Sequence, residues 1–284
     1  DYNGAFDEKN LCKEDKWILS KMNNLASEIT SNIDNFDMGV YAQKIYDFIW
    51  NEFCDWYIEI CKTRLYDKDC ETRLAAQYTL NKVLSDSLKL LHPIMPFITE
   101  EIYTKLYNND ETIMTAEWPK FDEKYNFKNE EQEIEKLKDL ISGIRNIRNN
   151  MNVHPSRKSK LIVVTENYTD LIKESTAILN KLAFASNVEI ESNKQNIPAN
   201  AVSVVTDGIE IFMPFEDLVD LAQEKERLSQ EKEKLESEVA RATKMLSNPG
   251  FVSKAPEAKI NEEKAKLAKY QEMLDSVVER LNNM

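Results

Sequence analysis

Residues 36–62 read FDMGVYAQKIYDFIWNEFCDWYIEICK, a run in which apolar side chains recur every three or four positions. This spacing places them on one face of a long amphipathic helix. Asp34 precedes the run and Asp37 is its second residue, and their carboxylates can accept hydrogen bonds from the free N–H groups at a helix start. The residues expected on the shared face are Tyr41, Ile45, Phe48, Ile49, Phe53, Trp56 and Ile60.

Amphipathic patterns on both sides of this run predict an antiparallel four-helix bundle over residues 1–120. An earlier helix continues from Trp17 through residues 20–33. A later helix should stop at His92, because a residue before proline is disfavoured in the α region, and Pro96 can open the next one. The inward residues expected on these last two helices are Ala76, Leu80, Val83, Leu84, Leu88 and Leu91, then Ile98, Ile102 and Leu106.

Residues 121–215 have the pattern of a small α/β module. Helices are expected over 129–150 and 171–184, separated by the strand-like run KLIVVT at 160–165. Further β-branched runs lie at 188–190, 202–205 and 209–212, and Asp207-Gly208 between the last two is a favoured hairpin turn.

Residues 216–284 predict an antiparallel coiled-coil hairpin. Two heptad patterns flank the turn sequence NPGFVSKAP (248–256), and each helix would project about 40 Å at 1.5 Å per residue. Two of the seam positions of the first helix are lysines, which favours a solvent-exposed two-helix arm over a helix buried inside a larger bundle. The expected seams are Leu218, Leu221, Lys225, Leu228, Lys232, Leu235, Val239, Ala242 and Leu246, then Ile260, Lys264, Leu267, Gln271, Leu274, Val278 and Leu281.

Composition narrows the function classes. The chain has 284 residues, 42% hydrophobic and 31% charged, which is typical of a soluble protein with a core. No apolar run approaches the roughly 20 residues of a membrane-spanning helix, and the first residues lack a signal-peptide pattern. Four cysteines without a Cys-x-x-Cys pair predict free thiols in a reducing cytoplasm. The chain begins without Met, as an internal piece of a longer protein would.

No catalytic centre, cofactor site or metal site is predicted. The two histidines, His92 and His154, each precede a proline and have no spaced serine, cysteine or carboxylate partner, so a structural role is favoured. Glycine-rich phosphate-binding loops are absent from the sequence.

The net charge of −13 argues against nonspecific nucleic-acid binding but allows a local positive surface. Residues 140–165 contain no acidic side chain. Their cations could contact phosphates, or could simply complement the dipole at a helix C-terminus, and the sequence favours neither. They are Arg145, Arg148, Arg157, Lys158 and Lys160.

The aromatic side chains of the second helix could also either bind RNA or belong to the core. Trp50, Phe53, Trp56 and Tyr57 could stack on unpaired bases, although for Phe53 and Trp56 a core position is favoured. The polar neighbours Asn51, Asp55, Lys62 and Arg64 are better suited to hydrogen bonding with base edges. At the arm tip, Phe251 either folds back over Leu246 or stacks on a ligand, and lysines 244, 254, 259 and 266 gather nearby.

Several segments together resemble the C-terminal part of the valyl-tRNA synthetases, a class I aminoacyl-tRNA synthetase family. WNEFCDWYIE and LHPIMPFITEE look like the helical anticodon-binding bundle of the valine, isoleucine and leucine enzymes. IRNIRNNMNVHPSRK (144–158) and NPGFVSKAP look specifically valyl. The isoleucine enzymes usually end in a zinc-binding module, for which this chain has no cysteine spacing.

The resemblance implies a tRNA(Val) partner and no DNA or membrane partner. The family signatures His-Ile-Gly-His and Lys-Met-Ser-Lys-Ser are absent, so ATP, Mg²⁺ and valine chemistry, and editing, would belong to N-terminal domains of the parent enzyme. The chain alone should be inactive, with its bundle on the anticodon loop and its arm at the corner where the D and T loops meet. A helical coiled-coil adaptor that binds no RNA is the alternative. The candidate contacts with the anticodon side of the tRNA are Trp17, Lys21, Asn24, Asn51, Asp55, Lys62 and Arg64. The five cations of residues 145–160 are candidate contacts with the RNA backbone. Lys244, Phe251, Lys254 and Lys259 are the candidate contacts at the arm tip.

Overall fold

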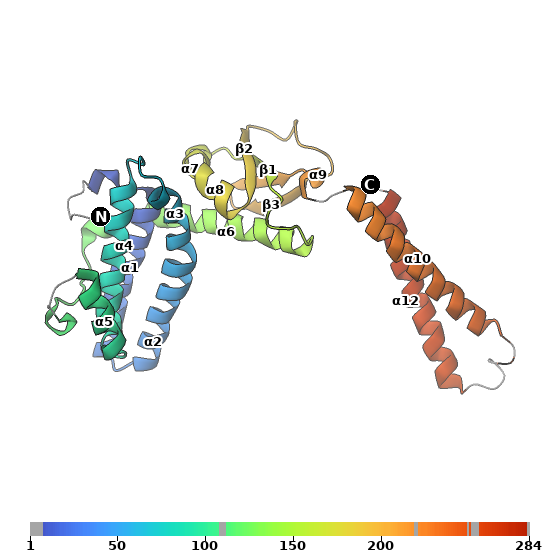
Figure 1. Cartoon of the computed structure of the whole chain (residues 1–284), viewed down its shortest axis with the longest axis horizontal. Coiled ribbons are helices and arrows are strands. Elements are labelled where there is room, and N and C mark those ends of the chain that lie inside the picture. The colour runs from blue at the N-terminus through green and yellow to red at the C-terminus, as the bar shows by residue number, and fades with distance from the viewer. Residues whose placement is uncertain (1–7, 108–111, 219–220, 249, 251–255, 283–284) are drawn as a thin grey trace. The chain divides into compact units, whose positions relative to one another are not determined.

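A computed structural model describes residues 8–107, 112–218, 221–248, 250 and 256–282 (Figure 1). The chain forms two compact units, Asp1–Met213 and Pro214–Met284. The first holds a helical bundle and a four-stranded sheet, and the second holds a helical hairpin. The predicted mainly α fold with a small α/β module and a coiled-coil hairpin is confirmed. The division of the first unit at residue 120 stays a prediction. None of the described helices combines the length and the hydrophobicity of a membrane-spanning segment.

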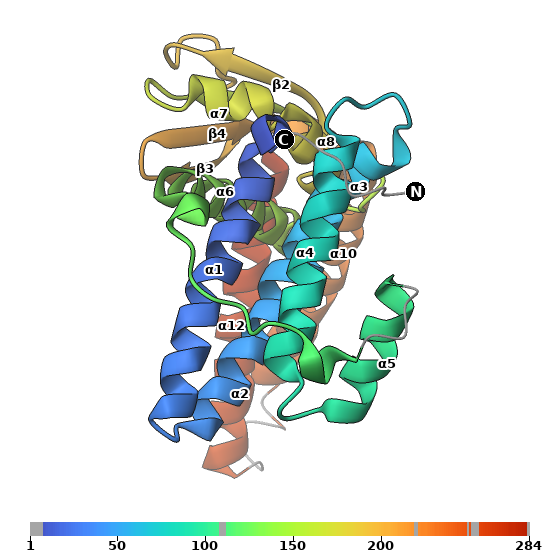
Figure 2. The same ribbon diagram turned by 90° about the vertical axis from the view of Figure 1, so that its left-hand side faces the viewer.

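The bundle is built around three long helical segments that lie side by side (Figure 2). The second of them is continuous, since α2 passes into the π-helical segment η2 and then into α3. Short 3-10 turns flank the bundle at both ends of its sequence. The elements are η1 (Glu8–Asn10), α1 (Lys13–Asp34), α2 (Met38–Asp47), η2 (Phe48–Ile58), α3 (Glu59–Tyr66), α4 (Arg73–Leu91), α5 (Pro96–Tyr107), η3 (Ile113–Thr115) and η4 (Glu123–Tyr125).

The π-helical segment changes which aromatic side chains enter the core. Tyr41, Ile45 and Phe48 are buried at the expected spacing, but the next buried residue, Phe53, follows after five positions. A π-helix absorbs this extra residue because its hydrogen bonds span five residues instead of four. Phe53 and Ile60 are thus buried as predicted, whereas Tyr57 is fully buried in place of the predicted Trp56, which is half-buried.

Helix α5 does not face inward as predicted. Ile98 and Ile102 are exposed and Leu106 is half-buried, whereas Thr99 and Tyr103 are buried. Tyr103 packs against Leu88 of α4 and Ile113 of η3. The apolar pattern located the helix correctly, but which of its faces is buried depends on the neighbours that are present.

A buried ion pair joins α1 to α3. Both carboxylate oxygens of Asp15 accept hydrogen bonds from the Arg64 guanidinium, at 2.6 and 2.8 Å, and the Tyr57 hydroxyl donates to Asp15 at 2.6 Å. All three side chains are buried. The bidentate hydrogen bonds replace those that the carboxylate would form with water, and so offset the free-energy cost of burying it.

Helix α6 (Lys128–Asn150) packs on α1 and, at its other side, on the sheet. The sheet order is β2-β1-β4-β3, with β1 parallel to β2 and antiparallel to β4. Gly143 allows close approach to the sheet, because a Cβ there would lie 2.6 Å from Val204 Cγ1. The strands are β1 (Ser159–Val164), β2 (Ala185–Glu191), β3 (Val202–Thr206) and β4 (Ile209–Met213).

The predicted hairpin joins β3 to β4 through Asp207-Gly208, and Gly208 has a φ of 84°, which favours glycine. The helix expected over 171–184 is two short helices instead, α7 (Thr169–Glu174) and α8 (Thr176–Leu182), which meet at the buried Ser175.

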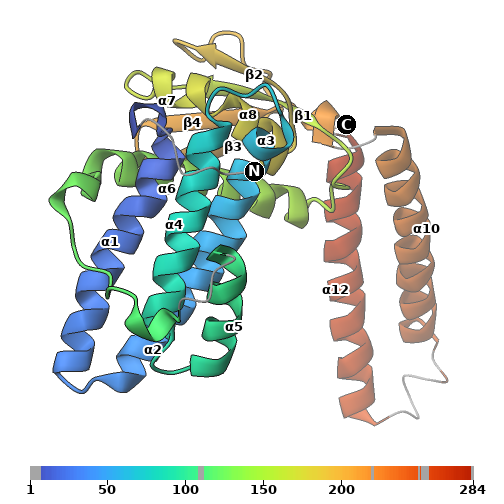
Figure 3. The same cartoon turned by 60° about the vertical axis from the view of Figure 1, so that its left-hand side comes forward.

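The second unit begins with α9 (Phe215–Leu218) and continues as the antiparallel pair α10 (Leu221–Leu246) and α12 (Glu257–Asn282) (Figure 3). Leu228, Leu235 and Ala242 of α10 are buried where the heptad pattern placed them. On α12 the predicted seam is confirmed at Leu274, which packs against the buried seam residues, but it differs at two positions. Val277 is buried in place of Val278, and Tyr270 packs against the seam cluster while Gln271 is exposed, because the neighbouring apolar side chain occupies the seam in preference to an amide.

Candidate nucleic-acid interface

A groove of about 380 Å³ lies between α1 and the α2–η2 helix. It brings together Lys21, Asn24 and Asn51, three of the seven residues predicted on the anticodon side, from positions 30 residues apart along the chain. We call this the α1–η2 groove. Its other lining residues are Leu25, Glu28, Lys44, Asp47, Phe48, Glu52 and Glu131.

The charge of the α1–η2 groove is not that of a phosphate site, because four carboxylates outnumber two lysines. Most of these groups are already paired. Lys44 bonds Glu28 at 2.5 Å and Asn24 donates to Glu131 at 3.1 Å. Within the described part of the chain, Asn51 is exposed and its side chain forms no hydrogen bond. Amides and carboxylates are the groups that hydrogen-bond to base edges, so the groove suits unpaired bases better than backbone phosphates.

Lys21 holds the acidic side of the groove in place. Its ammonium lies 2.8 Å from Glu135 of α6. Partial burial opposes ionisation of the ammonium, but the hydrogen bond to Glu135 outweighs it and raises the pKa of Lys21. Lys21 thus stays charged at neutral pH and ties α1 to α6.

Two of the predicted anticodon contacts are buried. Trp17 is fully buried, donates from Nε1 to Glu135 at 3.1 Å and carries Lys138 over its ring at 4.9 Å. Arg64 is enclosed with Asp15. We therefore assign both side chains to packing between helices and withdraw them as direct contacts. Their polar atoms had suggested a surface role, but they are satisfied inside the protein.

The remaining anticodon candidates lie further along the same helix and do not line the groove. Asp55 is exposed, and Lys62 is half-exposed and pairs with Glu59 one turn earlier. Of the aromatic side chains, Phe53 and Tyr57 belong to the core, while Trp50 is 55% exposed and lies parallel to Tyr46.

The five cations of residues 145–160 do not form one free surface. Arg148 is buried and donates to the carbonyls of Arg157 at 2.5 Å and His154 at 3.3 Å. Arg145 donates to the Leu182 carbonyl at 2.9 Å and lies over the Trp56 ring, and burial lowers its pKa. Both arginines therefore connect α6 to the sheet side of this unit, and Arg148 is withdrawn as a phosphate contact.

The other three cations lie nearer to solvent. Lys160 pairs with Glu189 of β2 at 2.6 Å, and Arg157 is half-buried. Lys158 is exposed, and no ion pair involves it within the described residues. It is the member of this group best placed to meet a phosphate.

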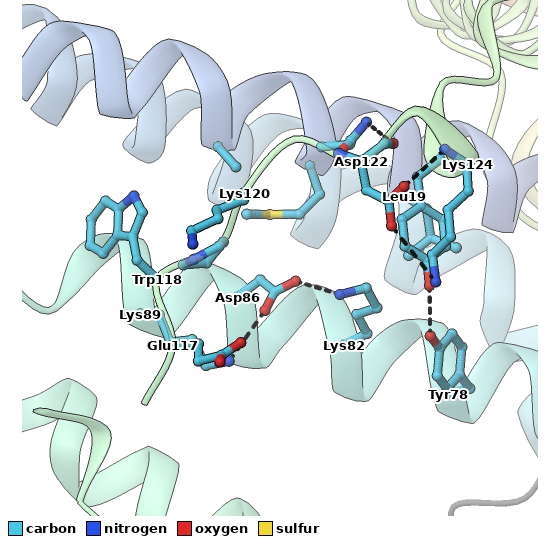
Figure 4. Close-up of a pocket in the computed structure, with 15 residues that line it drawn as sticks. Leu19, Tyr78, Lys82, Asp86, Lys89, Glu117, Trp118, Lys120, Asp122 and Lys124 are labelled. Atoms are coloured by element: carbon cyan, nitrogen blue, oxygen red, sulfur yellow. Dashed lines mark hydrogen bonds and ion pairs between the residues drawn. The ribbon is translucent and has the colours of Figure 1, made fainter. Parts of the chain in front are cut away.

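A second cavity, of about 310 Å³, lies between α1, α4 and the segment 117–125 (Figure 4). Its lysines are largely matched by carboxylates, since Lys82 and Lys89 both approach Asp86, at 2.8 and 3.6 Å. Lys120 is the lysine of this cavity without an acidic partner among the described residues. The cavity contains none of the predicted RNA contacts, and its near balance of charge gives no preference for a particular ligand.

Neither histidine has the surroundings of a catalytic base. His92 Nδ1 bonds the hydroxyl of Thr99 in α5 at 2.7 Å, and His154 Nδ1 bonds the hydroxyl of Ser156, two residues later, at 2.7 Å. Among the described residues, no three metal-ligating side chains come together.

On the arm, Lys244 and Lys259 are exposed near the ends of α10 and α12 that flank the turn. Neither has an ion-pair partner in the described part of the chain, in contrast to Lys266, which bonds Glu262 and Glu263. The other two tip candidates, Phe251 and Lys254, lie outside the described residues.

Sequence patterns alone did not reveal several groove residues. Glu131 reaches Asn24 and Ser20 across more than one hundred residues of sequence. Glu52 and Lys44 look like ordinary solvated positions of an amphipathic helix. No local signal distinguishes them, because only the packing of α1 against α6 and η2 places them together.

Two families match the chain. The anticodon-binding domain of tRNA ligase matches residues 15–164, and the valyl tRNA synthetase tRNA binding arm matches residues 220–284. The valine–tRNA ligases of Clostridium tetani and Clostridium perfringens are each 48% identical, over 277 and 268 residues. These alignments cover 96% and 94% of this chain but 32% and 30% of those proteins. The Thermotoga maritima valine–tRNA ligase is 38% identical over 266 residues, 94% of this chain and 30% of that protein.

The chain thus spans about a third of the length of these curated relatives. The matches cover both compact units and agree with the resemblance of the helix and turn motifs. The chain therefore belongs to the anticodon-binding family of tRNA ligases, in its valyl-tRNA synthetase branch.

Proposed function

We propose that this chain is the tRNA-docking region of a valine–tRNA ligase and that its partner is tRNA(Val). The observation that supports this most strongly is the presence, in one chain, of an anticodon-binding domain and a valyl-type tRNA-binding arm. Two separate domains of these families in one chain fit an RNA partner better than a small molecule.

In this proposal the α1–η2 groove receives unpaired bases of the anticodon loop. Asn51 offers a donor and an acceptor that no group of the described chain uses, and Asn24 lies across the groove on α1. An asparagine can form two hydrogen bonds with one base edge, which distinguishes bases by about 1–3 kcal/mol. The surrounding carboxylates favour exocyclic amino groups and disfavour phosphates.

In this proposal the arm contributes lysines that contact phosphates. Helices α10 and α12 have 26 residues each, so the hairpin is about 39 Å long. Lys244 and Lys259, together with Lys254, would meet backbone phosphates at the outer corner of the tRNA. Lys158, Arg157 and Lys160 remain candidate phosphate contacts on the first unit.

Valine activation, with ATP and Mg²⁺ as the cofactor and metal, would be carried out by other domains of the ligase, as would editing. We expect the ligase to act in the cytoplasm. Residues 1–284 should neither form valyl-adenylate nor charge tRNA.

A titration with tRNA(Val) at two salt concentrations tests the proposal. We expect binding that weakens as salt rises, because phosphate contacts release counterions. Changing the anticodon bases should weaken it further, whereas a tRNA for another amino acid serves as the control.

Equal affinity for every tRNA would show that the chain binds RNA only as a polyanion, without recognising tRNA(Val). If no tRNA binds even at low salt, the chain is better described as a helical coiled-coil adaptor.

A further inference from the structure

Helix α5 is packed on one side only. Thr99 and Tyr103 are buried, and Tyr103 contacts Leu88 and Ile113. The elements on which α5 mainly packs are α4 and η3, and Figure 2 shows it at the edge of the bundle.

Another side of this segment exposes a set of large apolar side chains, which we call the α5 apolar face. Ile98 and Ile102 are one turn apart and are 48% and 38% exposed, and Phe97 beside them is 91% exposed. A single exposed apolar side chain is ordinary, but a concentrated group of them marks an interaction surface. The face consists of Ile94, Met95, Phe97, Ile98 and Ile102.

The chemistry of this face does not suit RNA. Helix α5 carries Glu100 and Glu101 and one cation, Lys105, which bonds Glu101 at 2.5 Å. Phosphates would meet net negative charge here, and four of the five exposed side chains have no ring on which a base could stack. The surface instead fits an apolar polypeptide segment.

The size of the face points to a tethered partner. Interfaces between separate chains generally bury about 1,200 Å² or more in total, whereas α5 has only 12 residues. A segment of the same polypeptide needs less area, because tethering gives it an effective concentration in the millimolar range. The curated relatives are about three times as long as this chain, so a ligase of this family has ample polypeptide for this role.

We propose that the α5 apolar face is the docking site for an apolar segment of the ligase polypeptide outside residues 1–284. The inference rests on the proposed function, in that the partner is the rest of a valine–tRNA ligase. It also explains why the sequence pattern placed Ile98 and Ile102 inside, since they become buried only when that segment is present.

The test compares the same substitutions in two proteins, residues 1–284 alone and the full-length ligase. The double variant Ile98→Asn and Ile102→Asn should leave the Tm of the 284-residue chain unchanged and lower that of the ligase by several degrees. Met114→Asn is the matched control, because Met114 is an apolar residue of η3 that is 78% exposed, and it should shift neither Tm.

Hydrogen exchange gives a second measurement that needs no variant. Amides of residues 94–102 should exchange more slowly in the ligase than in the 284-residue chain. Equal exchange in the two proteins, or an equal loss of Tm in both, would overturn the inference. So would a concentration-dependent dimer of the 284-residue chain that the double variant abolishes, because the occupant would then be a second copy.

A tRNA(Val) titration of the unmodified ligase separates this inference from the proposed function. If the ligase fails to bind tRNA(Val), the proposed function fails, and the Tm and exchange comparisons still decide whether the face is covered. If the double variant loses tRNA affinity with no change in Tm, the face contacts RNA and the inference is overturned.

Discussion

The bundle contains long-range ion pairs of a kind that the described part of the arm lacks. In the bundle, Asp15 and Arg64 are buried as a bidentate pair whose partners are 49 residues apart in sequence. In the arm, the ion pairs between described residues join positions three or four apart on one helix, such as Lys232 with Glu236. The bundle thus uses charge to fix tertiary contacts, while the arm leaves charges at its surface, where Lys244 and Lys259 can meet a ligand.

The largest expected effect is on the buried pair of the bundle. Asp15→Ala removes the bidentate partner of the buried Arg64 guanidinium and the acceptor of the Tyr57 hydroxyl, leaving Glu14 at 3.2 Å from Arg64, and should cost about 3–5 kcal/mol of unfolding free energy. Urea denaturation measures this loss. Glu59→Ala, which removes the half-exposed partner of Lys62, should cost less than about 1 kcal/mol. An equal loss of unfolding free energy in the two variants would contradict the difference expected between a buried and a surface ion pair.

The seam of the arm should be the next most sensitive feature. Leu235→Asp places a carboxylate without a partner in the buried seam, at a cost of several kcal/mol. The arm should then melt at lower temperature while the bundle is unaffected, which two-phase thermal unfolding by circular dichroism would show. Tyr270→Ala should destabilise the arm more than Gln271→Ala does. The reverse order would contradict the observed register of α12.

Charge reversal at the arm should weaken binding without unfolding. Lys244→Glu with Lys259→Glu should lower tRNA(Val) affinity about tenfold or more and reduce its salt dependence, because two phosphate contacts are lost. The helical circular dichroism signal should stay constant. Lys234→Glu, an exposed position in the middle of α10, is the control. A loss of helicity in the double variant would show that those lysines are structural.

A smaller effect is expected at the α1–η2 groove. Asn51→Ala should reduce the discrimination between cognate and altered anticodons by about 1–3 kcal/mol. Stability should not change, because the side chain makes no hydrogen bond within the described residues. Gln43→Ala, which removes a surface bond to Asp47 on α2, should leave discrimination intact. Unchanged discrimination in both variants would exclude the groove as the base-reading site.

The mildest prediction concerns the thiols, all of which lie in the bundle. Burial raises the pKa of Cys12 to about 11 and that of Cys61 to about 12. Their thiolate fraction at pH 8 is therefore far below that of a free cysteine, and alkylation should be slow until the bundle unfolds. Rates should rise as the pH approaches 11. Fast alkylation of both at pH 8 in the folded protein would contradict their burial.

Local patterns predicted most of the elements. The heptad seam of α10, the α6 helix and the Asp207-Gly208 hairpin all follow from residues close in sequence, because helix periodicity and turn chemistry are local properties. The family could be identified for the same reason, since its motifs are contiguous runs.

Only the tertiary structure determined which side chains are buried and which groups they contact. The π-helical register that buries Tyr57, the exposed side of α5 and the enclosure of Trp17, Arg64 and Arg148 depend on which distant segments pack against each helix. The α1–η2 groove exists only because α1, η2 and α6 meet. A sequence pattern specifies that a side chain needs a partner, whereas the packed chain determines which partner it receives and which side chains remain free to bind.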